Sequence, residues 1–87
     1  MAEEGQRYTK QLIGKTVVTK TGKKFGEVQN LTFEIRTGEL IHIMLRNTTS
    51  YCEGLELEKD SKGVSLIPFS AVVAIGDYLV VAEEDII

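Results

Sequence analysis

The sequence has almost no cysteine, histidine or proline and no tryptophan, with one of each of the first three among its 87 residues. The single cysteine, Cys52, cannot form an internal disulfide, and no second cysteine or neighbouring histidine accompanies it to bind zinc. Residues 2–11 contain no apolar run, so neither a signal peptide nor a membrane-spanning helix is expected there. We expect a cytoplasmic protein with a reduced thiol, no metal or other cofactor, and no insertion into a membrane.

Side chains suited to catalysis are equally scarce. General acid–base catalysis requires titratable groups gathered in a cleft, whereas the only histidine, His42, lies between two isoleucines in a strand-like segment. The acids of LELEKD, residues 55–60, alternate as on the solvated face of a strand and match no cation-binding loop. TGKKFG, residues 21–26, lacks the glycine spacing of a phosphate-binding loop. We therefore expect no catalytic residue and a protein that is not an enzyme.

Charge is divided unevenly along the chain. Residues 1–24 contain six basic and two acidic residues, a net charge of +4, and residues 25–87 contain four basic and eleven acidic residues, a net charge of −7, which together give −3. The basic part offers a candidate nucleic-acid patch made of Arg7, Lys10, Lys20, Lys23 and Lys24. The alternative interpretation is an ordinary solvated surface.

Residues 15–36 show the patterns of a β-hairpin and a longer strand. KTVVTK, residues 15–20, is a β-branched run, and Gly22 and Gly26 after it are expected as turn residues. In EVQNLTFEIR, residues 27–36, an alternating apolar face is formed by Val28, Leu31, Phe33 and Ile35. The odd step between the first two predicts a β-bulge near Gln29 and Asn30.

The segment LIHIMLR, residues 40–46, follows a predicted tight turn centred on Thr37 and Gly38. Its two faces are both largely apolar: Ile41, Ile43 and Leu45 on one, Leu40, His42 and Met44 on the other. If Ile41, Ile43 and Leu45 fill the core, nothing evident covers the face of Leu40, His42 and Met44. That face, or the last strand of the sheet, is therefore predicted to lie in a homodimer contact. The candidate interface residues are Leu40, His42, Met44, Tyr78 and Val80.

The second half of the chain begins with a polar segment, residues 47–54, that is expected to be a loop. LELE and VSLI then flank KDSKG as a hairpin that ends at Pro68, and residues 69–76 are expected as a tight crossover before a last strand, DYLVVA. No segment shows a helical repeat. The predicted core consists of Phe33, Ile43, Leu66, Phe69, Val72 and Ile75.

One domain of about six short antiparallel strands without helices predicts an all-β fold, a small closed or partly open antiparallel β-barrel. The motifs IGKTVV at 13–18, FGEV at 25–28, Thr37-Gly38, and IPF at 67–69 followed by AIGD at 74–77 occur in an order that resembles the PRC-barrel domain family. This family is named after the photosynthetic reaction centre H subunit and includes the carboxy-terminal part of a ribosomal RNA maturation factor. The chain is most similar to archaeal stand-alone, single-domain members.

The resemblance implies a flexible amino-terminal segment at 1–10, a barrel domain at 11–82 and an acidic tail at 83–87, which is either a docking tail or a frayed end. It also implies a non-catalytic adaptor that binds a protein partner through the barrel surface, and the archaeal forms suggest a role in cell division. The alternative function is an RNA-processing or ribosome-associated accessory factor that uses the basic patch. The identity of the partner does not follow from the sequence.

Overall fold

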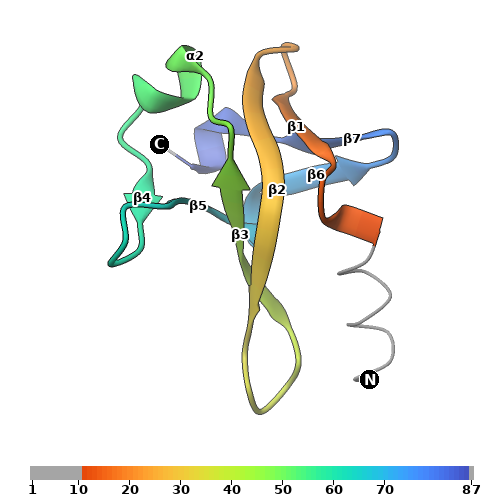
Figure 1. The fold of residues 1–87 in the computed structure, drawn as a ribbon. Coiled ribbons are helices and arrows are strands. Elements are labelled where there is room, and N and C mark those ends of the chain that lie inside the picture. The colour runs from red at the N-terminus through yellow and green to blue at the C-terminus, as the bar shows by residue number, and fades with distance from the viewer. Residues whose placement is uncertain (1–10, 87) are drawn as a thin grey trace.

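The computed structural model describes residues 11–86, and it shows one seven-stranded sheet in the order β4-β5-β3-β2-β1-β7-β6 (Figure 1). The strands are β1 (Thr16–Thr19), β2 (Lys24–Phe33), β3 (Leu40–Arg46), β4 (Glu58–Lys59), β5 (Ser65–Pro68), β6 (Val72–Ile75) and β7 (Tyr78–Val81). Neighbouring strands are antiparallel except β1 and β7, which run parallel. The all-β prediction is confirmed. Because β4 and β6 are not paired with each other, the sheet is a barrel only approximately.

Short helical segments also occur in the described residues: Gln11 and Leu12 are helical, α2 (Ser50–Glu53) and η1 (Phe69–Ala71) lie between strands, and η2 (Glu83–Asp85) follows β7. The expectation of a chain without helices was therefore wrong. Helix α2 lies in the polar segment that was expected to be a loop, where the Thr49 side chain caps it by accepting a hydrogen bond from the Cys52 backbone N–H. A single turn is too short to show a helical repeat in the sequence, and the cap is its only local signal.

The first hairpin joins β1 to β2 through a tight turn. The Gly22 N–H donates to the Thr19 carbonyl at 2.9 Å, and Gly22 has a φ of +90°, which an L-residue adopts only with strain. Gly26, also expected in the turn, instead lies inside β2, buried. A Cβ at Gly26 would lie 2.8 Å from the Arg46 carbonyl oxygen, so this glycine allows β2 to pass close to the end of β3.

The second hairpin, β2–β3, extends away from the rest of the sheet (Figure 1). Its register shifts between Val28 and Asn30, as the odd apolar spacing predicted. The Glu34 N–H donates to the Glu39 carbonyl at 2.8 Å and closes a loop of four residues, which is longer than the predicted two-residue turn. Ile35, predicted on the apolar face of the strand, lies in this loop and is 98% exposed.

The core is formed by side chains of β1, β2, β3, β5 and β7. Its fully buried side chains include Phe25, Val17, Val28, Ile43, Ile67, Leu79 and Val81. The alternation of β1 and β7 explains part of this set, because every second residue of each strand is buried. Phe25 is the largest fully buried side chain, and its ring centroid lies 5.9 Å from that of Tyr51 on α2.

The predicted core is correct only in part. Ile43 and Leu66 are buried, whereas Phe33, Phe69 and Val72 are half-buried and pack against the core from its margin. Ile75 is 46% exposed, because it lies on the edge strand β6, where no further strand covers it. Ile41, expected inside with Ile43, is 39% exposed, since it lies at the start of β3, beside the protruding loop.

Residues 83–86 pack against the sheet. The Ala82 N–H donates to the Ala71 carbonyl at 2.8 Å, which brings η2 next to η1, and Ile86 packs partly buried against the core. The proposed segment 1–10 lies outside the described residues, and the boundaries at 11 and 82 remain predictions.

Candidate interaction surfaces

The outer face of β3 carries three of the predicted interface residues, Leu40, His42 and Met44, all half-buried. Leu40 packs against the margin of the core. His42 lies with its Nε2 3.3 Å from a Glu58 carboxylate oxygen on β4, and its backbone N–H donates to the Thr32 hydroxyl at 3.0 Å. Two of the three side chains therefore already have partners within the molecule, and this face offers little free apolar area.

The outer face of β7 carries the other two, Tyr78 and Val80. In the parallel register Tyr78 lies beside Thr16 of β1, and Val80 beside Val18. Leu79 and Val81 point into the core, so Tyr78 and Val80 point outward. Tyr78 is 56% exposed, and the surface around it is formed mainly by small and β-branched residues.

The β3 and β7 candidates do not form one surface, since β2 and β1 lie between these two strands in the sheet. On the adjoining strand β6, Val73 and Ile75 are 52% and 46% exposed, and Ile75 is paired with Leu79, so it lies on the opposite face of the hairpin from Tyr78. Three of the seven exposed large apolar side chains thus belong to one hairpin. The sequence signal was present, because residues 67–76 carry no charge, but it was interpreted as core.

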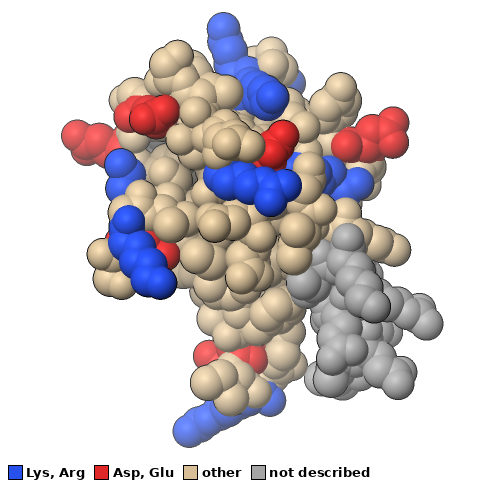
Figure 2. Space-filling model, in the orientation of Figure 1, with Lys and Arg blue, Asp and Glu red and all other residues tan. Residues whose placement is uncertain are grey.

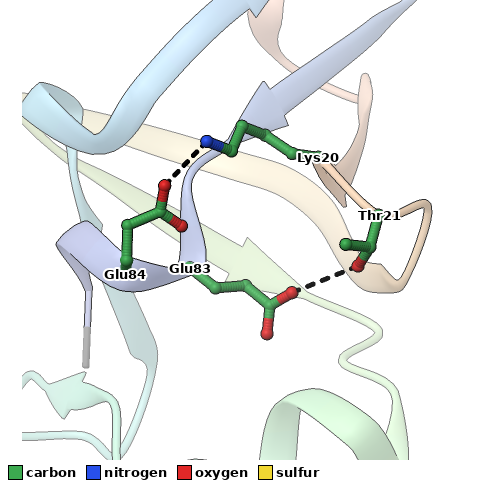
Figure 3. A network of polar contacts seen from close by, with 4 residues as sticks. All are labelled: Lys20, Thr21, Glu83 and Glu84. Carbon is green, nitrogen blue, oxygen red and sulfur yellow. Dashed lines mark hydrogen bonds and ion pairs between the residues drawn. The ribbon is translucent and has the colours of Figure 1, made fainter.

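Of the predicted basic patch, Arg7 and Lys10 lie outside the described residues, and the other three lysines lie within them. Lys20 forms an ion pair with Glu84, with 2.7 Å between Nζ and Oε1 (Figure 3). The Lys23 Nζ lies 5.9 Å from the centroid of the Tyr51 ring, and Lys24 is exposed. On the face seen in Figure 2, basic and acidic side chains are interspersed and form no single basic area.

A network of polar contacts joins η2 to the first hairpin (Figure 3) and, through Tyr51, to α2. Glu83 accepts hydrogen bonds from the Thr21 hydroxyl, at 3.3 Å, and from the Tyr51 hydroxyl. The hydrogen bond to Glu83 raises the pKa of Tyr51, and the hydrogen bond from Lys20 lowers the pKa of Glu84. These contacts could not be predicted from the sequence, because the partners are 32 to 64 residues apart.

A second charged group lies at the end of β3. Glu27 accepts hydrogen bonds from Asn47, at 3.1 Å, and from Arg46, at 3.3 Å, and these bonds lower the pKa of its carboxyl. All three side chains are engaged with one another. The group therefore fastens the chain where β3 ends and the segment leading to α2 begins.

Few side chains of the described residues are placed for metal binding or catalysis. Within 11–86 no three side chains of the histidine, cysteine, aspartate and glutamate types lie close enough together to hold a metal ion. Burial raises the pKa of the Cys52 thiol, which makes it a poorer nucleophile. No helix in this part of the chain has both the length and the apolar character needed to cross a membrane.

The chain was compared with models of known protein families. The model of the PRC-barrel domain matches residues 4–85, which is nearly the whole chain. A search of curated proteins found no match.

Proposed function

Because this chain belongs to the PRC-barrel domain family, we propose that it is a non-catalytic adaptor that binds a protein partner through the outer surface of its sheet. The PRC-barrel is not a known catalytic fold. The observation that carries the proposal is the exposed Tyr78 on the outer face of β7, bordered by Val80 and Val18. Tyrosine is enriched at protein–protein contacts, since it offers a large apolar area and one polar group.

The archaeal stand-alone members that the sequence resembles provide the narrower version of this proposal. In that version the protein acts in archaeal cell division, where it would join other proteins. An adaptor role requires neither a cofactor nor a catalytic group, so a contact surface such as the one around Tyr78 would suffice for it.

The experiment is a pull-down from native extract with and without nuclease, using the wild-type chain and Tyr78→Ser. Ile35→Ser is the matched control, because it also removes an exposed apolar side chain, at the tip of the β2–β3 hairpin. We expect a nuclease-resistant partner that Tyr78→Ser loses and Ile35→Ser keeps. If both variants retain the partner equally, the Tyr78 surface is not the binding site.

The RNA-associated role remains the second candidate, supported by the exposed Lys23 and Lys24 at the start of β2. It is weakened by the pairing of Lys20 with Glu84. In this case Lys23→Glu with Lys24→Glu would abolish binding, the captured material would be nuclease-sensitive, and affinity would fall steeply as salt rises, because counterions are released from phosphate contacts.

A further inference from the structure

The last described residues, 83–86, are held to the rest of the molecule by their side chains, and we refer to them as the C-terminal segment. Ala82, just before them, makes the last backbone hydrogen bond to another element, from its N–H to a carbonyl of η1 at 2.8 Å. Asp85 and Ile86 then donate their N–H groups to the carbonyls three residues before them, within the same turn of helix. In the part of the chain that the structure describes, the C-terminal segment therefore lies against the fold as a separate short peptide would, and it adds no strand to the sheet.

Three donors from other elements face the acids of this segment. The Lys20 Nζ lies 2.7 Å from a Glu84 carboxylate oxygen, and the Thr21 hydroxyl donates to Glu83 at 3.3 Å (Figure 3). The Tyr51 hydroxyl, on α2, donates to the same Glu83 side chain. Hydrogen bonds to an ionised carboxylate are stronger than those between neutral groups, so this arrangement of donors favours an acidic occupant.

The surroundings of the C-terminal segment combine positive charge with an apolar margin. Residues 20–24 contain three lysines and no acid, although the chain as a whole has a net charge of −3. At the end of the segment, Ile86 is partly buried against the core, and so is Phe69 of the neighbouring η1. An occupant of this place therefore needs acidic side chains followed closely by an apolar one.

The polar contacts that hold the segment are of a kind that opens readily. The side chains of Lys20 and Glu84 are 52% and 61% exposed, and Thr21 and Tyr51 also lie at the surface. Exposed ion pairs contribute little to stability and are screened by salt. Because the described sheet ends with β7 and does not include the segment, the segment can leave this place while β7 stays paired with β1 and β6.

We propose that Lys20, Thr21 and Tyr51, with the apolar margin beside η1, form a binding site for an acidic segment of a partner protein in which an apolar residue closely follows the acids. The chain's own C-terminal segment has this pattern and occupies the site as an internal competitor. Its short tether gives it an effective concentration in the millimolar range, so the site stays closed until a stronger ligand displaces the segment. The inference goes beyond the proposed function and does not rest on it, because the surface around Tyr78 is a different one.

The first test titrates a synthetic peptide with the sequence of residues 82–87 into the isotope-labelled full chain and follows binding by NMR. In the variant Glu83→Gln with Glu84→Gln the internal competitor is weakened, so the peptide should bind at least about fivefold more tightly than to the wild type. Adding Lys20→Gln to this variant should remove most of the gain. Lys62→Gln in the same background is the matched control, because it removes an exposed lysine elsewhere, and it should change the affinity by less than about twofold. Circular dichroism checks that each variant is folded.

The second test uses the wild-type chain. At millimolar peptide the amide signal of Ile86 should move toward its position in the Glu83→Gln, Glu84→Gln variant, because the peptide displaces the C-terminal segment, and the amide of Lys59 on β4 should not move. A peptide with serine in place of both isoleucines should bind at least about fivefold more weakly, since it has no apolar side chain to bury.

Three results would each overturn the proposal. The first is a peptide that binds the wild type as tightly as the Glu83→Gln, Glu84→Gln variant, because the segment then does not compete. The second is equal binding of the serine and isoleucine peptides, which would mean that the site recognises charge alone. The third is a variant whose signals shift with its own concentration when no peptide is added, which would make the segment of a second copy the occupant.

Discussion

The two edges of the sheet are built differently. β4 has two residues, Glu58 and Lys59, both charged, and the Glu58 carboxylate contacts His42 across β5. β6 is twice as long and has no charge. A short charged edge resists pairing with another chain, whereas a longer uncharged one permits it. The charge and the shortness of β4 protect that edge, whereas β6 is protected by the register shift between Val72 and Ala74, which bends the strand.

The largest expected effect comes from comparing a buried side chain on β7 with the exposed side chain opposite it on β6. Leu79 and Ile75 are directly opposite each other, yet Leu79 is fully buried and Ile75 is about half exposed. Leu79→Ala should lower the free energy of unfolding by about 2–5 kcal/mol, and Ile75→Ala should lower it much less, by about 1 kcal/mol or under. Urea unfolding measures both. Equal losses would show that the edge is packed after all.

A chain ending at Ala82 tests how far η2 supports the β6–β7 side of the sheet. This truncation removes Ile86, which is partly buried against the core, and we expect a loss of about 1–2 kcal/mol from that apolar contact. The matched control, Ile86→Ala in the chain ending at Ile86, keeps the acidic residues. If the truncated chain is as stable as the wild type, Ile86 contributes nothing to the fold.

Removing the charge of the other edge should make β4 resemble β6. Glu58→Val with Lys59→Val should produce new concentration-dependent association, because no charge then opposes pairing at this edge, and stability should fall only slightly, because the lost contact of Glu58 with His42 is exposed. Glu56→Val is the control, because it removes a nearby exposed charge outside the strand. Sedimentation measures the result, and absence of new association would mean that two residues are too few for pairing.

The smallest effect concerns the ion pair of Lys20 and Glu84. The pKa of Glu84 is lowered from 4.5, so its contribution is present above that pH and is lost as pH falls through the folded-state pKa. The pKa of Lys20 is raised from 10.5, so the same contact contributes fully below 10.5 and is lost as pH rises through the raised folded-state pKa. Denaturation midpoints of wild type and Glu84→Gln should differ slightly at neutral pH and converge in acid. A difference that persists at a pH well below the folded-state pKa of Glu84 would contradict this origin, since the carboxylate is then protonated.

Much of the local structure could be predicted from residue patterns. The β-branched run at 15–20, the bulge after Val28 and the termination of β5 at Pro68 all occur where the sequence placed them. Phe25 was missed as a core residue because it stands in a segment rich in glycine and lysine that resembles a turn. Of the five candidate interface residues, only Tyr78 is more than half exposed, and it lies with Val80 on the outer face of β7.

The sequence by itself determined the strand-forming segments, the hairpins that connect neighbours and the membership of the family, since these depend on alternation, turn residues and ordered local motifs. Only the tertiary structure decided that β1 pairs with β7 in parallel, which leaves β6 as an edge and exposes Ile75. It also decided that Lys20 and Glu84 meet across 64 residues. A period of two shows which side chains share a face, but whether a strand has a neighbour on each side depends on pairing between distant segments.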